Sequence, residues 1–303
     1  MFIAELGGFK RIIFQCIAFL LTINAFGEED RYKHWAFVSP KFYSVPKIKT
    51  EGWPKNEIDN FILAELEHSN ITPAKKAEPA QLIRRVYYDL IGLPPSPERV
   101  EEFLKDHSSE AVARIVNDLL DSPQYGERWG RHWLDVARYG DSNGGDENHA
   151  YPHAWRYRNY VIDAFNRDLP YDEFINEQLA GDLLESKPDE RSRRVTATGF
   201  LAIGTKILAE KDSVKKRADI IDEQIDTVSR SFMGISVSCA RCHDHKFDPI
   251  PTADYYALAG IFHSTKIEDQ SLSKPEDEQR EEKKKARLVV INNQLEDFEG
   301  KFC

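Results

Sequence analysis

Two thiols and an imidazole that could do chemistry lie together in the last third of the chain, as Cys239, Cys242 and His243. The spacing Cys-x-x-Cys-His is the one that attaches c-type haem: each thiol adds to a vinyl group of the porphyrin, and the histidine becomes the proximal iron ligand. The spacing therefore predicts covalent haem c, with Cys239, Cys242 and His243 as the cofactor-binding residues.

Two other interpretations of the same segment remain open. Structural zinc is bound tetrahedrally by Cys and His. Adjacent Cys242 and His243 cannot easily both bind one tetrahedral ion, so His245 would be the better third ligand, with a distant His or Asp as the fourth. The metal-binding histidines to consider are therefore His243 and His245. The third interpretation is a plain Cys239–Cys242 disulfide, which an oxidising compartment permits.

The sixth position of a haem iron bound at His243 is not assigned by the spacing. Met233 lies only six residues before the first thiol. Several histidines could serve by folding back, namely His132, His149, His153, His245 and His263. An open sixth position would favour peroxidase-like or ligand-binding chemistry over simple electron transfer.

Charged residues also allow an acid–base or metal-assisted hydrolase as an alternative. The candidate catalytic residues are Asp135, Arg138, Asp141 and Asp248, which could converge with His243 and His245 on an extracellular polymer. The simpler interpretation of Asp135 and Arg138 is a structural salt bridge. Asp141 opens a polar, glycine-rich loop that ends at His149; its spacing does not match an EF-hand, and a solvated turn is the expectation.

Composition and charge narrow the class of protein. The chain has 303 residues, of which 41% are hydrophobic and 30% charged, as in ordinary globular proteins. Its formal net charge is −10, which opposes binding to nucleic acids or to anionic membranes, because both reward clustered Lys and Arg.

The N-terminus resembles a secretory signal peptide over residues 1–27. Lys10 and Arg11 precede an apolar run, and Ala25-Phe26-Gly27 offers small residues at a cleavage site. The alternative is an uncleaved membrane anchor. We therefore expect an exported protein, periplasmic or extracellular, in which Cys16 leaves with the peptide.

The rest of the pattern predicts an all-α fold, an irregular helical bundle over residues 55–265. An extended N-terminal arm (28–54) precedes it and a charged C-terminal helix (266–303) follows. Inward faces are expected at Ile58, Phe61, Ile62 and Leu66, at Trp129, Trp133, Val136 and Ala137, and at Phe174, Ile175, Leu179 and Leu183. Residues 186–194 are expected to form a loop. The acidic face of the helix over 212–232 (Asp219, Asp222, Glu223, Asp226) is expected to be solvated.

Four stretches of the chain, from about residue 55 to 265, resemble the planctomycete cytochrome c-type domain family, a domain of unknown function. They are residues 129–139 (WGRHWLDVARY), 157–166 (YRNYVIDAFN), 178–184 (QLAGDLL) and 239–256, which contains the Cys-x-x-Cys-His motif. The resemblance implies an exported haem protein. In such proteins a further domain usually follows, so the chain is expected to be a truncated member that lacks this downstream domain.

The sequence thus predicts an exported, all-α, c-type haem protein for periplasmic electron transfer or redox chemistry with a redox partner protein. One alternative is a metal-stabilised module of a polysaccharide-processing enzyme. The other is a non-catalytic interaction module whose trailing helix pairs with a partner.

Overall fold

The computed structural model describes residues 34–272 and 283–292, and all regular structure in these residues is helical. The sole β-type pairing found there is an isolated antiparallel bridge between Ser142 and Ala150. The all-α prediction is therefore confirmed. The expected signal peptide and most of the charged tail lie outside the described residues; residues 283–292 of that tail are helical and exposed.

The chain divides into two compact units, whose described parts are residues 34–82 with 239–254, and the remainder. In the first unit a short 3₁₀ turn, η1 (Trp35–Phe37), precedes residues 38–54, which form no helix or strand. Helix α3 (Glu57–His68) follows, and its N-cap Asn56 accepts a hydrogen bond from the Asp59 amide. The Glu67 carboxylate accepts bonds from the Lys49 and Thr50 amides at 2.8–3.0 Å, which fastens the arm to α3.

The expected inward face of α3 is wrong. Leu63 is fully buried, whereas Ile58, Phe61 and Ile62 are 68%, 42% and 48% exposed. Leu63 is thus the one fully buried residue of this helix.

The second unit begins with three short helices, α4 (Pro79–Leu90), α5 (Pro97–Lys105) and α6 (Ala111–Leu120). Ser96 caps α5 and Pro97 occupies its first turn, as the sequence predicts. Gly92 ends α4 with a φ of +73°, a conformation that favours glycine. A small core joins these helices, formed by Ile83, Tyr87, Ile115 and Leu119.

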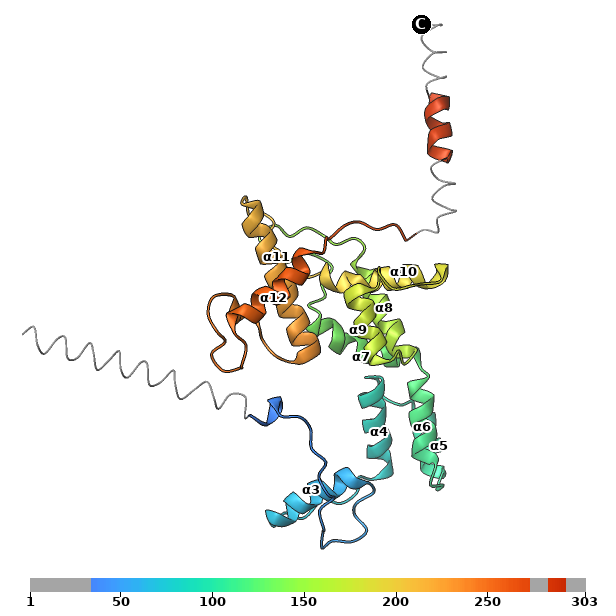
Figure 1. Cartoon of the computed structure of the whole chain (residues 1–303). Helices are drawn as coiled ribbons and strands as arrows, with labels where there is room; N and C mark the ends of the chain where they lie inside the picture. Colours follow the sequence, from blue (N-terminus) through green and yellow to red (C-terminus); the bar gives the residue numbers. More distant parts are fainter. Residues whose placement is uncertain (1–33, 273–282, 293–303) are drawn as a thin grey trace, which may run out of the picture. The chain divides into compact units, whose positions relative to one another are not determined.

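The larger core of the second unit surrounds Trp133 on α7 (Pro123–Val136), which packs along α8 (Ala154–Asn166), near α9 (Tyr171–Ala180) and α10 (Pro188–Ala197) (Figure 1). Its indole Nε1 donates to Tyr157 Oη at 2.9 Å and to Gln178 Oε1 at 3.0 Å. The Phe174 ring meets the indole edge-on, with 4.9 Å between the two ring centroids. The indole thus buries its ring and satisfies its polar atom at once.

The expected inward faces of α7 and α9 are confirmed at Trp133, Ala137 and Phe174, which are buried, and are wrong at other positions; the loop expected at α10 is also wrong. Trp129 and Val136 of α7 are 38% and 45% exposed, because the buried face instead carries Gly126 and Gly130 against α8. Helix α9 ends at Ala180, so Leu183 is exposed, while Gln178 is buried through its bond to Trp133. Residues 188–197 form helix α10 rather than a loop.

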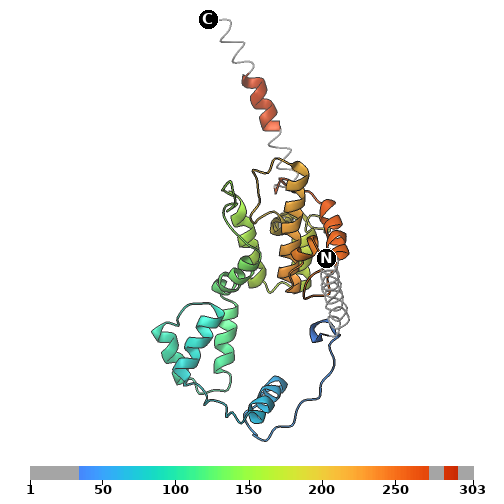
Figure 2. The same cartoon turned by 90° about the vertical axis from the view of Figure 1, so that its left-hand side faces the viewer.

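Helix α11 (Ser213–Val228) continues into a π-helical turn, η3 (Ser229–Met233), which Gly234 ends. Helix α12 (Thr252–His263) lies beside α11, as Figure 2 shows, and Arg217 Nη2 donates to the Phe262 carbonyl at 2.9 Å. No helix in the described ranges is long and apolar enough to cross a membrane.

Candidate functional site

The two thiols of the Cys-x-x-Cys-His segment lie on a turn of the first unit. A 3₁₀ turn, η4 (Ser238–Arg241), contains Cys239, and the Cys242 amide donates to the Cys239 carbonyl at 3.4 Å. Both cysteines are free and exposed. The turn therefore leaves two unpaired thiols, three residues apart in the sequence, exposed at the surface.

The two histidines of the segment have opposite environments. His243 is exposed, and its Nδ1 lies 2.8 Å from the Asp244 carbonyl oxygen. Because a carbonyl only accepts, this contact places a proton on Nδ1 and leaves Nε2 with its lone pair, the arrangement used by metal-ligating histidines.

His245 is instead buried, with 5% of its surface exposed. Its Nδ1 accepts a hydrogen bond from the Asp248 amide at 2.9 Å and lies 3.2 Å from Asp248 Oδ2. Its amide donates to the Ile250 carbonyl at 2.9 Å. These contacts give His245 and Asp248 a role in fixing the loop.

Other bonds close the loop behind the thiols. Asp244 Oδ1 accepts from the Thr252 amide at 2.8 Å, which joins the end of the motif to the start of α12. The residues of the segment thus fit covalent haem: two accessible thiols, one accessible imidazole with a defined tautomer, and a tied loop that holds them.

The acidic residues of α11 hold the chain on both sides of this segment. Asp226 Oδ1 accepts from Ser238 Oγ at 3.1 Å, and Asp222 Oδ1 accepts from Tyr255 Oη at 2.7 Å. Asp226 also pairs with Arg230 at 2.8 Å. The expectation of a merely solvated acidic face is therefore wrong, because its residues bind partners far along the chain.

In the part of the chain that the structure describes, no three His, Cys, Asp or Glu side chains are assembled as metal ligands. This includes Asp141, Asp146 and Glu147 of the polar loop. Asp141 accepts from Tyr139 Oη at 2.7 Å, and Asp146 accepts from the amides of Leu208 and Ala209 at 3.1 and 2.9 Å.

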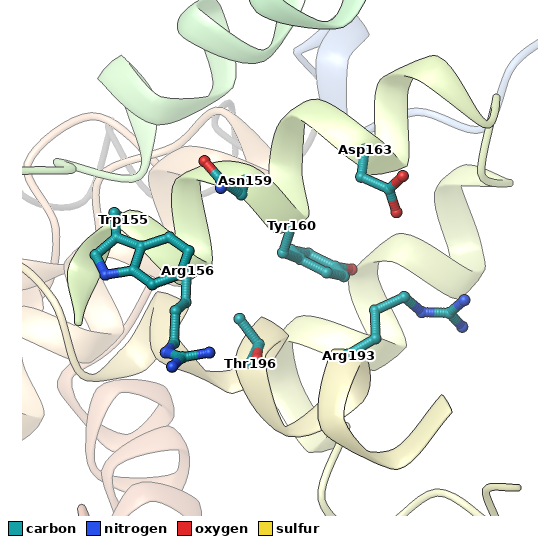
Figure 3. A pocket seen from close by; sticks show the side chains of 7 residues that line it. All are labelled: Trp155, Arg156, Asn159, Tyr160, Asp163, Arg193 and Thr196. Atoms are coloured by element: carbon teal, nitrogen blue, oxygen red, sulfur yellow. The ribbon is translucent and has the colours of Figure 1, made fainter. Parts of the chain in front are cut away.

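An open pocket of about 230 Å³ lies between α8 and α10 of the second unit (Figure 3). Trp155, Arg156, Asn159 and Asp163 line it from α8, and Arg193 and Thr196 from α10. None of these residues is among the sequence candidates.

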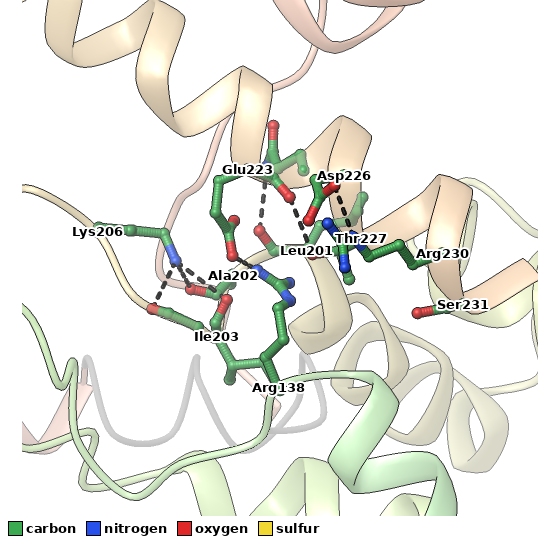
Figure 4. A network of polar contacts seen from close by, with 12 residues as sticks. Arg138, Leu201, Ala202, Ile203, Lys206, Glu223, Asp226, Thr227, Arg230 and Ser231 are labelled. Carbon is green, nitrogen blue, oxygen red and sulfur yellow. Dashed lines mark hydrogen bonds and ion pairs between the residues drawn. The ribbon is translucent and has the colours of Figure 1, made fainter. Parts of the chain in front are cut away.

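The candidate Arg138 belongs to a half-buried polar network in the second unit (Figure 4). It has a left-handed backbone with a φ of +56° and forms an ion pair with Glu223 of α11. Its guanidinium finds no other hydrogen-bond acceptor among the described residues. Burial lowers the pKa of Arg138 to about 10, an effect that the Asp226 carboxylate opposes, so the side chain is a cation at neutral pH.

The expected Asp135–Arg138 salt bridge is wrong, because Arg138 turns to Glu223 where the chain leaves α7. Asp135 is exposed. Asp141 bonds with Tyr139, so the structure brings none of these three candidates together as a catalytic group. In the first unit, by contrast, Cys239, Cys242, His243, His245 and Asp248 all lie within one loop.

Lys206 and Asn143 are polar residues of this unit that sequence reasoning missed. Lys206 Nζ donates to the carbonyls of Ala202, Ile203 (3.2 Å) and Gly204 (3.4 Å). Asn143 is 1% exposed, and its amide pairs with both backbone groups of Lys206 at 2.8–2.9 Å. An asparagine in a polar loop between Asp141 and Asp146 gives no sequence signal of such burial.

Comparisons with known proteins identify the chain at the level of a family. No curated protein and no solved structure shows significant similarity to it. The family model PSCyt2, described as a protein of unknown function (DUF1549), matches residues 57–267, which include α3 to α12 and the Cys-x-x-Cys-His segment. The chain therefore belongs to the PSCyt2 family, whose function is unknown.

Proposed function

We propose that this chain is an exported c-type haem protein, in which Cys239 and Cys242 form the two thioether bonds and His243 is the proximal iron ligand. The observation that carries the proposal is the pairing of two free, exposed thiols with an exposed imidazole whose Nδ1 lies against the Asp244 carbonyl. The family name PSCyt2 suggests a cytochrome-like domain and agrees with this proposal, while the family is described as one of unknown function.

The chain's own residues have separate tasks in this proposal. The η4 turn presents the thiols, and the Asp244 carbonyl orients His243 so that Nε2 is the ligating atom. His245, Asp248 and the Asp244–Thr252 bond keep the loop in one conformation. When bound, the haem supplies one-electron redox chemistry.

The proposed setting is outside the cytoplasmic membrane, with a redox partner protein. Residues 1–27 supply the export signal in this proposal, and exported thiols suit covalent haem attachment. N-terminal sequencing of protein recovered from a periplasm would test the export step: a mature chain that begins near residue 28 supports it, and an intact N-terminus in the cytoplasm opposes it.

The haem assignment is tested by expressing the full chain through a periplasm that carries haem-attachment machinery, followed by a pyridine haemochrome assay. A c-type α-band that survives acid–acetone extraction is expected for the wild type. It should disappear in the double variant Cys239→Ser, Cys242→Ser. His243→Ala should shift the spectrum or prevent maturation, whereas the matched control His107→Ala, an exposed histidine between α5 and α6, should leave it unchanged.

A colourless but folded protein would contradict the haem assignment. Metal analysis then separates the alternatives: one equivalent of zinc that is lost in the double cysteine variant would favour the metal-stabilised module of a polysaccharide-processing enzyme. No metal and an unchanged fold with a chelator would favour an interaction module.

A further inference from the structure

The pocket between α8 and α10 combines an indole with polar planar groups. Trp155 is 42% exposed, and the guanidinium carbon of Arg156 lies 4.7 Å from its ring centroid. In Figure 3, Trp155, Arg156, Asn159 and Asp163 follow one wall, and Thr196 and Arg193 lie on the other. The volume of about 230 Å³ is below the range of about 300–1,000 Å³ usual for drug-sized ligands, and it suits a single ring.

The pocket carries excess positive charge. Arg156 has no ion-pair partner within the described ranges. The Asp163 carboxylate is already neutralised by Arg167 at 2.7 Å. Arg193 Nη2 donates to the buried Glu177 at 2.7 Å, and Glu177 is shared with Arg194. An anionic group on a ligand could therefore pair with the Arg156 guanidinium, because no carboxylate of the described residues already occupies it.

The pocket also offers groups that suit hydroxyls. The Asn159 carboxamide is exposed and makes no hydrogen bond in the part of the chain described. Arg193 Nε is buried and has no acceptor among the described residues, so a ligand hydroxyl would reach it after a small shift of this side chain. Together with Asp163, these atoms can both donate to and accept from hydroxyl groups on a ring.

We infer that this pocket binds a sugar acid, a hydroxylated six-membered ring that carries one carboxylate. The carboxylate pairs with Arg156, the apolar edge of the ring lies against Trp155, and hydroxyls bond with Asn159, Asp163 or Arg193. Binding is non-covalent. The inference is independent of the proposed haem attachment, since it uses only residues of α8 and α10.

The test is a titration of the full chain with D-glucuronate, followed by calorimetry and by the tryptophan indole signals in NMR. Saturable binding is expected, with D-glucose, benzoate and inorganic phosphate each binding about tenfold more weakly or worse, because each lacks the charge, the hydroxyls or the ring. No saturable glucuronate binding overturns the inference. Benzoate or phosphate binding as tightly as glucuronate overturns the assignment to a sugar acid.

Matched variants locate the site. Arg156→Gln should weaken glucuronate binding about tenfold or more, since one charge-assisted pair is lost. Arg131→Gln removes the same charge from an exposed position on α7 and should change affinity little. Trp155→Leu should likewise weaken binding, while Trp129→Leu, another half-exposed tryptophan, should not. Equal losses within either pair would overturn the inference.

Discussion

Lys206 is a residue whose ionisation is changed both by burial and by a neighbouring charge. Burial, together with the positive charge of Arg138, lowers the pKa of Lys206 to about 8. Its Nζ is nevertheless fully bonded to the carbonyls that follow the 3₁₀ turn η2 (Thr198–Leu201). Lys206 therefore stabilises the end of this turn through its hydrogen bonds. Burial opposes this effect, because it raises the free energy of the folded protein when Lys206 is protonated.

The pKa of Lys206 predicts a rise in stability with alkaline pH. A lysine whose pKa is lower in the folded state than in the unfolded one binds its proton less tightly when folded, so folding is favoured as pH rises through about 8. We expect the free energy of unfolding of the wild type, relative to Lys206→Met, to increase by about 2 kcal/mol between pH 7 and pH 10. Urea titrations at each pH measure it, and a flat difference between the two proteins would contradict the assignment.

At the scale of the element, the pairing of α7 with α8 depends on glycine at one close approach. A Cβ on Gly126 would lie 2.4 Å from the Ile162 carbonyl oxygen and 2.6 Å from Asn166 Cγ. The Gly126 amide also donates to Asn166 Oδ1 at 2.8 Å. The two helices can approach this closely only because no side chain lies between them.

Gly126→Ala should therefore destabilise the protein by about 2–4 kcal/mol, because backbone atoms of α8 would have to move. Gly130→Ala is the matched control on the same helix. Its Cβ would meet Ile162 Cγ1 at 3.4 Å, an ordinary contact, and alanine favours helix, so the effect should be small. Thermal unfolding followed by circular dichroism compares the two, and similar costs would disprove the close approach.

Sequence reasoning succeeded for elements whose signals are local. Ser96-Pro97 begins α5 and Gly92 ends α4, in agreement with the residue types that usually begin and end helices, because caps and turns depend on a few neighbouring residues. The sequence likewise grouped the thiols and histidines of the 239–248 loop, since their proximity follows from spacing alone.

Failures occurred where distant contacts decide the structure. Helix α10 has a charged sequence that resembles a loop, yet Arg193 and Arg194 pair with the buried Glu177 of α9. Arg138 pairs with Glu223, 85 residues later, rather than with nearby Asp135. No periodicity encodes such pairs, so neither the Arg138 network nor the α8–α10 pocket could be predicted.

At the scale of the whole molecule, the two units bury very different amounts of apolar surface. Helix α3 of the first unit has one buried residue, Leu63, whereas α8 of the second has Ala154, Tyr157, Tyr160, Val161 and Ala164. Regions with few buried apolar contacts open at lower free energy than well-packed cores.

Hydrogen exchange should therefore protect α8 far more than α3. We expect the amides of α3 to exchange at least about 100-fold faster, which corresponds to an opening free energy lower by roughly 3 kcal/mol. Exchange measured by mass spectrometry on the full chain resolves both helices. Equal protection would show that the two units open as one.

The bonds that Asp226 and Asp222 make with Ser238 and Tyr255 have a consequence for how this chain can change over time. The two aspartates are one helical turn apart on α11, and they hold the residues that flank the sixteen-residue segment 239–254. Loss of either aspartate would therefore release one end of the segment that carries the thiols, while the other end stays fastened. Over time, Asp226 and Asp222 should change together with the residues that they hold, Ser238 and Tyr255.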